Sequence, residues 1–324
     1  MNTTMTTATR GQAELLFGPV AQHQRPGSEH RILVGTASWT DPTLIKSGRF
    51  YPKGCTSAEA RLRYYASRFP LVEVNSSYYA VPDAGTAQLW AERTPNDFVF
   101  NIKAFRLFTG HQAPIVSLPP QVREALGSWP KANIDLTDMP AELIELTWQL
   151  YKEALLPLRA AGKLGAIHFQ FTPRVQAGKR AEDLLEDVRS RLPGDLLTVE
   201  FRHRSWFDDA HRERTFDFER QHGLVNVVVD SPQGFVNSVG THWEVTNPEL
   251  ALVRLHGRNA ETWNVRGPAA SDRFNYRYST EELKELAVSV RQLAKRVGMT
   301  HVVFNNNFED QGQANAAELL QLLR

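Results

Sequence analysis

Eight short runs of apolar and β-branched residues recur along the chain, and segments of helical periodicity separate most of them. A strand–helix–strand order favours parallel pairing with right-handed crossovers, and eight such units can close into a barrel. The sequence therefore predicts an α/β fold with a single (β/α)8 barrel of the TIM type. The expected strands are residues 32–38, 71–77, 98–104, 164–171, 196–202, 224–230, 250–256 and 301–306.

Seven helices are expected between these strands, and their ends carry typical signals: Ser279 and Glu282 have the spacing of a capping box, and Gly162 lies where a helix ends before a strand. No helix pattern lies between the sixth and seventh strands. Two long connections, 105–139 and 258–278, are expected at the mouth of the barrel. The expected helices are residues 57–67, 84–92, 140–161, 181–191, 209–221, 280–297 and 314–322.

Composition excludes several classes of protein. With 324 residues, 42% of them hydrophobic, the chain can bury a large core, and a net charge of +1 argues against a chain that is basic as a whole for binding nucleic acid. The single cysteine, Cys55, excludes an internal disulfide and a site of several thiolates. No run reaches the roughly 18–20 apolar residues that span a membrane, so we expect a cytoplasmic protein.

Residues 1–30 are rich in Thr, Gln, Gly and Pro and lack sustained periodicity, so we expect a disordered extension before a barrel domain at 31–324. Within it, QAELLF (Gln12 to Phe17) resembles the peptide by which bacterial DNA-processing proteins bind the sliding clamp. A tail that merely contains a few apolar residues is the alternative.

Five of the expected strands alternate apolar and polar residues near their C-terminal ends. Because residues i and i+2 share a face of a strand, the apolar residues would pack on the helices and the polar ones would point into the barrel. Buried, unpaired charges cost several kcal/mol each, so we expect these polar side chains to converge at the mouth. They include Glu73, Asn75, Lys103, His168, Gln170, Glu200, Arg202, Arg254 and His256, joined by Thr36, Ser38, Asp230 and residues 305–307 from the other strands.

Carboxylates that face fixed cations indicate general acid/base chemistry on an anionic substrate such as a phosphate ester or a sugar acid. In this hypothesis Glu73 and Glu200 move a proton and His256 is the partner acid, as in a hydrolase, lyase or isomerase. Lys103, Arg202 and Arg254 would hold oxyanions. The other expected substrate-binding residues are Asn75, Gln170, His203, Asp230, Asn306, Trp39, Tyr78 and Trp206.

Three alternatives stay open at this point. The polar side chains could form an internal salt-bridge network, because Glu73, Glu200 and Asp230 balance three cations. The donors Glu73, His168, Glu200, Asp230 and His256 could hold a divalent metal, although no H-E-x-x-H spacing requires one. A nucleic-acid-associated protein, either a binder or a phosphodiester hydrolase, would use the arginines for phosphates and the aromatic residues for bases.

Several motifs on these strands resemble those of the YecE-like family, the domain of unknown function 72. They are EVNSSYY (73–79), VEFRHRSW (199–206), RLHGRN (254–259), FNNN (304–307) and QANAAELL (313–320). The resemblance implies a TIM-type barrel and carries no established reaction. GTASW (35–39) and FQFTP (169–173) depart from the family pattern, which suggests a different rim near strands one and four. The resemblance maps family motif positions onto Glu73, Asn75, Lys103, Gln170, Glu200, Arg202, His203, Asp230, Arg254, His256 and Asn306.

Overall fold

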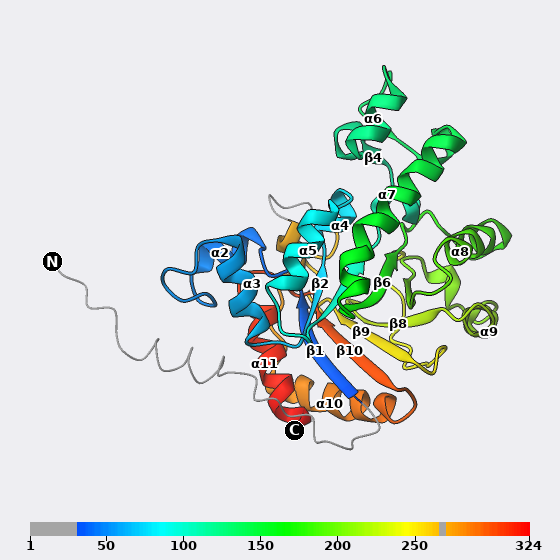
Figure 1. Ribbon diagram of the computed structural model, residues 1–324. Coiled ribbons are helices and arrows are strands. Elements are labelled where there is room, and N and C mark those ends of the chain that lie inside the picture. The colour runs from blue at the N-terminus through cyan, green and yellow to red at the C-terminus, as the bar shows by residue number, and fades with distance from the viewer. Residues whose placement is uncertain (1–30, 266–269) are drawn as a thin grey trace.

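Eight parallel strands close into a barrel in the computed structural model, which describes residues 31–265 and 270–324 (Figure 1). The order around the barrel is β1-β10-β9-β8-β7-β6-β3-β2, which confirms the predicted fold class. The expected extension and the Gln12 to Phe17 peptide lie outside the described residues. The barrel strands are β1 (Arg31–Ala37), β2 (Leu71–Val74), β3 (Val99–Lys103), β6 (Leu164–Gln170), β7 (Leu197–Glu200), β8 (Val225–Asp230), β9 (Leu250–Leu255) and β10 (Met299–Phe304).

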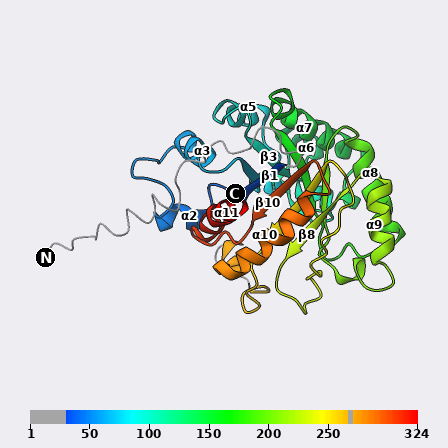
Figure 2. The ribbon, with the colours of Figure 1, turned by 90° about the horizontal axis from the view of Figure 1, so that it is seen from below.

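Helices surround the strands, as Figure 2 shows from below. All seven expected helices are present, with ends that differ by at most three residues: α3 (Ala58–Ala66), α5 (Ala84–Glu92), α7 (Ala141–Ala160), α8 (Lys179–Arg191), α9 (Arg212–Gln221), α10 (Thr280–Ala294) and α11 (Gln311–Leu323). Residues 231–249 contain no helix, as expected, and none of the described helices is long and apolar enough to cross a membrane. Ser279 and Glu282 form the predicted capping box of α10.

Several connections contain short elements that the sequence pattern did not predict, and many of them lie in the segment after β3. Figure 1 shows α6, β4 and one end of α7 projecting from the barrel, so this part of the connection 105–139 extends away from the strands. The antiparallel pair β4–β5 holds this projection together. The additional elements are α2 (Pro42–Ser47), α4 (Ser76–Tyr79), α6 (Pro120–Leu126), β4 (Ala113–Pro114), β5 (Asn133–Ile134), η1 (Arg106–Thr109), η2 (Ile115–Ser117), η3 (Leu136–Asp138), η4 (Arg204–Trp206) and η5 (Ala270–Phe274).

Two apolar layers lie on the two faces of the barrel wall. The outer layer joins the helices to the alternate strand residues Val72, Val74, Phe100, Ile102, Ile167, Phe169, Val199, Phe201, Val253 and Leu255, as expected. A smaller inner layer includes Leu33, Leu71, Val227 and Leu252. On the same face of β2 and β9, Glu73 follows Leu71 and Arg254 follows Leu252, so the charged cluster lies above an apolar floor.

The structure corrects the orientation of Thr36. Its N–H and Oγ1 lie 2.8 and 2.9 Å from the Tyr65 hydroxyl of α3, so Thr36 faces the helices and not the interior. Gly35 and Ala37 have the opposite orientation. A Cβ on Gly35 would lie 1.9 Å from the carbonyl oxygen of Leu71, so the close approach of β1 and β2 requires glycine there.

Candidate functional site

Arg254 on β9 is the centre of the charged cluster and is completely buried. Its Nε and Nη2 donate to the two oxygens of Glu73 on β2, at 3.0 and 2.7 Å, and its Nη1 donates to Glu200 on β7. All three nitrogens of the guanidinium therefore have carboxylate partners. This geometry leaves Arg254 no free edge for an oxyanion, so the expected role of Arg254 in substrate binding is not supported.

Glu200 has partners on both carboxylate oxygens. Its Oε1 accepts from Nη1 of Arg202 at 2.8 Å and lies 3.3 Å from Nε2 of His256, and its Oε2 lies 3.6 Å from Nε2 of His168. Burial alone would raise the pKa of Glu200, but Arg254, His256 and Arg202 hold that pKa well below its usual range. Glu200 is therefore a permanent anion at neutral pH.

His256 is a neutral imidazole in this cluster. Burial, together with Arg254 and Arg202, lowers its pKa to about 4 against the opposing effect of Glu200. Its Nδ1 lies 2.8 Å from Nδ2 of Asn305, and its Nε2 faces Glu200. Both ring nitrogens are thus engaged, and the ring stacks against Phe274.

Lys103, at the end of β3, differs from the other charged groups because no carboxylate of the described residues forms an ion pair with it. Its Nζ donates to Oε1 of Gln170 at 3.0 Å and lies 4.7 Å from the ring centroid of Tyr78. Burial, followed by Arg254, lowers the pKa of Lys103 to about 8, although Glu73 and Glu200 act against the shift.

Cations gather around Tyr78 and His111 at the mouth. Arg106 lies 5.3 Å from the centroid of the Tyr78 ring, and the His111 ring contacts the edge of Tyr78. Burial and then Lys103, Arg106, Arg174 and Arg202 lower the pKa of His111 to about 3. Sequence reasoning missed Arg106 and His111, yet both lie in the first eight residues of the connection after β3, where residues of the mouth are expected.

The expected balance of central charges is wrong, because Asp230 does not join the cluster. On β8 the register places Val229 opposite Arg254 on the inner face, so Asp230 has the other orientation. Its carboxylate accepts from Nη2 and Nε of Arg258, at 2.8 Å and 3.0 Å, and from the Tyr278 hydroxyl at 2.7 Å. Three cations, Lys103, Arg202 and Arg254, therefore face only Glu73 and Glu200.

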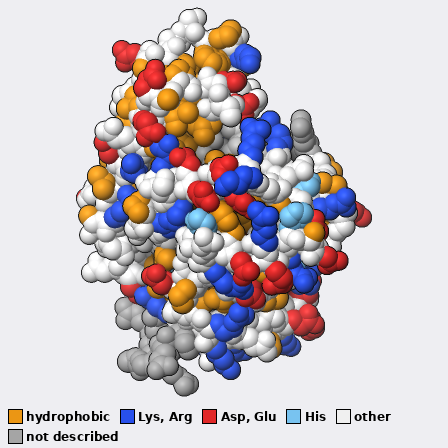
Figure 3. Space-filling view, turned by 90° about the vertical axis from the view of Figure 1, so that its right-hand side faces the viewer, with side chains coloured by type: hydrophobic (Ala, Val, Ile, Leu, Met, Phe, Trp, Pro, Cys, Tyr) orange, Lys and Arg blue, Asp and Glu red, His pale blue; other side chains and the backbone are white. Residues whose placement is uncertain are grey.

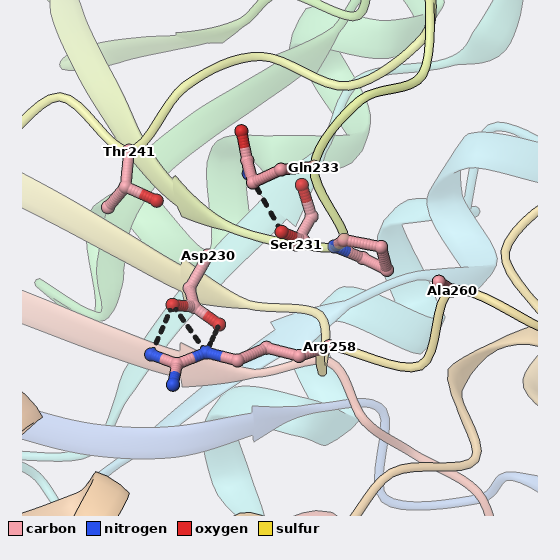
Figure 4. Close-up of a pocket in the computed structure, with 7 residues that line it drawn as sticks. Asp230, Ser231, Gln233, Thr241, Arg258 and Ala260 are labelled. Carbon is pink, nitrogen blue, oxygen red and sulfur yellow. Dashed lines mark hydrogen bonds and ion pairs between the residues drawn. The ribbon is translucent and has the colours of Figure 1, made fainter.

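A pocket of about 340 Å³ lies beside this second ion pair (Figure 4). Figure 4 shows Arg258 joined to Asp230 and Gln233 joined to Ser231. Because the two charges of the pair neutralise each other, the pocket wall carries no excess charge. The lining residues are Asp230, Ser231, Pro232, Gln233, Thr241, Arg258 and Ala260.

Two expected substrate-binding aromatic residues belong to the core. Trp206 stacks on Phe201 with ring centroids 3.7 Å apart and donates to the Val175 carbonyl at 2.9 Å. Trp39 is buried and packs edge-on against Trp90 of α5. Of the three expected aromatic residues, only Tyr78 contacts the cations of the mouth.

Asn306 and His203 make local contacts. Nδ2 of Asn306 donates to Oδ1 of Asn315 at 2.9 Å and to the Tyr276 carbonyl, whereas the preceding Asn305 reaches His256. The His203 imidazole lies 2.9 Å from Oγ of Ser205 at the start of η4. Oδ1 of Asn75, after β2, is buried and has no hydrogen-bond partner within residues 31–265 and 270–324.

The proposed metal donors do not form a ligand set. Within residues 31–265 and 270–324, no group of three His, Cys, Asp or Glu side chains converges as metal ligands would. The carboxylates of Glu73, Glu200 and Asp230 instead accept hydrogen bonds from the guanidinium groups of arginines.

Figure 3 shows Lys and Arg interspersed with Asp and Glu on one face of the molecule, and hydrophobic side chains in its upper part.

Comparison with known proteins identifies the family. The model described as "Protein of unknown function DUF72" matches residues 33–324. The UPF0759 protein YunF of Bacillus subtilis is 29% identical over 90% of this chain and 94% of its own length. The UPF0759 protein YecE of Escherichia coli is 27% identical over 62% of this chain and 59% of its own.

Two crystal structures of DUF72 family proteins are similar to the whole barrel. That from Enterococcus faecalis has a TM-score of 0.73 and 26% identity, and covers 90% of this chain and 95% of its own. That from Thermotoga maritima has a TM-score of 0.69 and 30% identity, and covers 91% of this chain and 99% of its own. The chain therefore belongs to the DUF72 family and has the TIM-barrel fold.

Proposed function

We propose that this protein is an enzyme that binds a small anionic substrate at the C-terminal mouth of the barrel and acts on it by acid/base chemistry. The observation that carries the proposal is Lys103, which is half-buried at the mouth and which, within the described part of the chain, has the Gln170 amide and no carboxylate as a hydrogen-bond acceptor. An ammonium that is removed from water without a carboxylate is stabilised when an anion binds beside it.

Arg202 is the second group that would contact the anion. Only its Nη1 is engaged by Glu200, and its guanidinium lies 4.8 Å from the centroid of the Trp263 ring. A guanidinium that is fixed by one carboxylate and one aromatic face still offers donors to a carboxylate or phosphate.

In this proposal the expected catalytic residues have a positioning role: Glu73, Glu200 and His256 orient the side chains around them. The guanidinium of Arg254 is fixed between the carboxylates of Glu73 and Glu200. The carboxylate of Glu200 in turn orients Arg202 and His256. Lys103, with a pKa of about 8, is the group at the mouth that exchanges a proton near neutral pH.

The test is the binding of inorganic phosphate, measured by calorimetry and by the shift in melting temperature. Binding is expected for the wild type and is expected to weaken about tenfold or more in Lys103→Met and in Arg202→Met. The matched control is Lys284→Met, which removes an exposed lysine of α10 and should bind as the wild type does. Equal binding by Lys103→Met and the control would contradict the proposal.

A nucleic-acid-associated protein is the second candidate, because Lys103 and Arg106 both lie over the Tyr78 ring, where a base would stack beside its phosphate. Anisotropy of a labelled single-stranded oligonucleotide tests it. Binding should weaken with rising salt and in Tyr78→Ala. No binding at low ionic strength would remove this candidate.

Recruitment to the sliding clamp through Gln12 to Phe17 remains a separate proposal, since that peptide lies outside the described residues. It rests on the resemblance of QAELLF to clamp-binding peptides. A clamp pull-down that is insensitive to the double variant Gln12→Ala and Phe17→Ala would dismiss it.

A further inference from the structure

We propose that Lys103 is a nucleophilic amine that forms an imine with the carbonyl carbon of an anionic aldehyde or ketone. This inference rests on the proposed function, because it names the substrate class of the same site. The anionic group of the substrate would contact Arg202, and its carbonyl carbon would face Nζ.

The position of Lys103 suits this role. It is the last residue of β3, so its side chain lies at the end of the barrel where active sites of this fold occur. Its Nζ makes one hydrogen bond, to the neutral amide of Gln170, and no ion pair with a described carboxylate. A carboxylate partner would hold the ammonium form and block attack, so its absence among the described residues leaves the amine accessible.

The surrounding charges favour the neutral amine. Arg254 and Arg202 face Lys103 from β9 and from the end of β7, and both oppose its protonation, whereas Glu73 and Glu200 favour it. The Tyr78 ring lies on one side, and the pKa of its hydroxyl is raised to about 12, mainly by burial, so it is uncharged at neutral pH. His111, beside Tyr78, is also neutral there. Burial with these charges lowers the pKa of Lys103 to about 8.

The chemistry balances without an oxidant or a cofactor. The lone pair of Nζ forms the C–N bond while the carbonyl π pair moves to oxygen, and one proton passes from nitrogen to that oxygen to give a carbinolamine. The second N–H proton then leaves with the hydroxyl as water while the C=N bond forms, so one water leaves for each imine formed. Protonation of the imine nitrogen withdraws electrons from the adjacent carbon atoms and assists loss of a proton or cleavage of a bond there.

The probe is pyridoxal 5′-phosphate, which carries both an aldehyde and an anion, followed by borohydride reduction and peptide mass spectrometry. At pH 7.5 a limiting amount of the probe should label Lys103 at least about tenfold more than the exposed Lys284, because burial and the neighbouring arginines favour the amine form of Lys103 and Arg202 would hold the phosphate of the probe. Inorganic phosphate should protect Lys103 and leave labelling of Lys284 unchanged.

The outcomes separate this inference from the proposed function. Equal labelling of Lys103 and Lys284, with phosphate binding intact, would overturn the imine and leave the anion site in place. Absence of both labelling and phosphate binding would overturn both. Lys103→Arg keeps the charge but cannot form an imine, so it should bind phosphate and lose the label at this position. If that variant is unstable, the comparison of Lys103 with Lys284 in the wild type still tests the inference.

Discussion

Arg254 and Lys103 show how differently two cations of one barrel interior can be used. Arg254 binds two carboxylates through three nitrogens and is sealed from solvent, whereas Lys103 lies at the mouth with one amide acceptor among the residues that the structure describes. A buried guanidinium that lost one of its carboxylates would remain charged in a poorly solvated place. Arg254 is therefore a determinant of stability, and Lys103 is available for binding.

Removal of the Glu73 charge should destabilise the protein strongly. Glu73→Gln removes the carboxylate that accepts from Nε and Nη2 of Arg254 and leaves this buried guanidinium with Glu200, which it shares with Arg202, so we expect a loss of about 3–5 kcal/mol in the free energy of unfolding. Urea titration measures it. The control is Glu59→Gln, which breaks the exposed pair with Arg63 on α3 and should change that free energy far less than Glu73→Gln does. Similar losses in both variants would contradict this interpretation.

Anion binding at Lys103 should depend on pH. The ammonium is present below its pKa of about 8 and is lost above it, so the affinity for sulfate, whose own charge stays constant, should fall about tenfold from pH 7 to pH 9. Lys103→Arg keeps its charge over this range and should show no such fall. Calorimetric titration at each pH provides the measurement, and the same fall in both proteins would rule out Lys103 as its origin.

At the scale of elements, helix α9 carries a buried carboxyl that the candidate site does not use. Glu219 is 0% exposed, and burial raises its pKa well above the usual range. A carboxyl whose pKa is higher in the folded than in the unfolded state binds more protons when folded. Its contribution to stability therefore decreases as pH rises above the unfolded pKa of about 4.3.

Replacing this carboxyl should stabilise the fold under alkaline conditions. We expect Glu219→Gln to raise the free energy of unfolding by about 1 kcal/mol or more at pH 8, because the cost of ionising or keeping a proton on Glu219 disappears. The gain should shrink toward pH 4, where the carboxyl is protonated in both states. Urea unfolding at the two pH values tests this, and a gain that does not depend on pH would contradict the ionisation argument.

At the scale of the whole molecule, closure of the barrel buries several imidazoles in its interior. His301 on β10 is 1% exposed, with Nδ1 3.1 Å from Oδ1 of Asn101, and its pKa is lowered to about 3, mainly by burial. The pKa of His168 is likewise lowered well below 6.5, first by burial and then by Arg254. Each of these groups must be neutral in the folded state.

Acid should therefore unfold the barrel from a pH well above the range of ordinary carboxylates. Each buried imidazole binds its proton only on unfolding between pH 6.5 and its folded pKa, so stability falls with pH by about 1.4 kcal/mol per unit for each group. Urea unfolding from pH 6.5 to pH 4.5 gives the slope. His301→Gln should reduce that slope by about 1.4 kcal/mol per pH unit. An unchanged slope in His301→Gln would contradict the assignment.

Pattern alone located Glu73, Glu200 and Arg254, because strict alternation of apolar and charged residues leaves one orientation for each side chain. It failed for Thr36 and Asp230, whose strands are apolar on both faces, so the orientation of a terminal polar residue depends on the register with its neighbours. The ion pair of Asp230 with Arg258 comes from a loop beyond β9, and no spacing along the chain predicts it. Trp206 was misplaced because an aromatic residue after a strand can pack inward or line a rim equally well.

The order of elements, the parallel barrel and the identity of its inward-facing charges follow from the sequence by itself, since hydrophobic periodicity and crossover handedness are local properties. Tertiary structure alone decided how those charges pair. Arg254 binds two carboxylates, Lys103 binds none of the described ones, and Asp230 pairs with Arg258 outside the cluster. Pairing depends on distances of a few ångströms between strands remote in the chain, and Coulomb and desolvation energies change steeply over such distances.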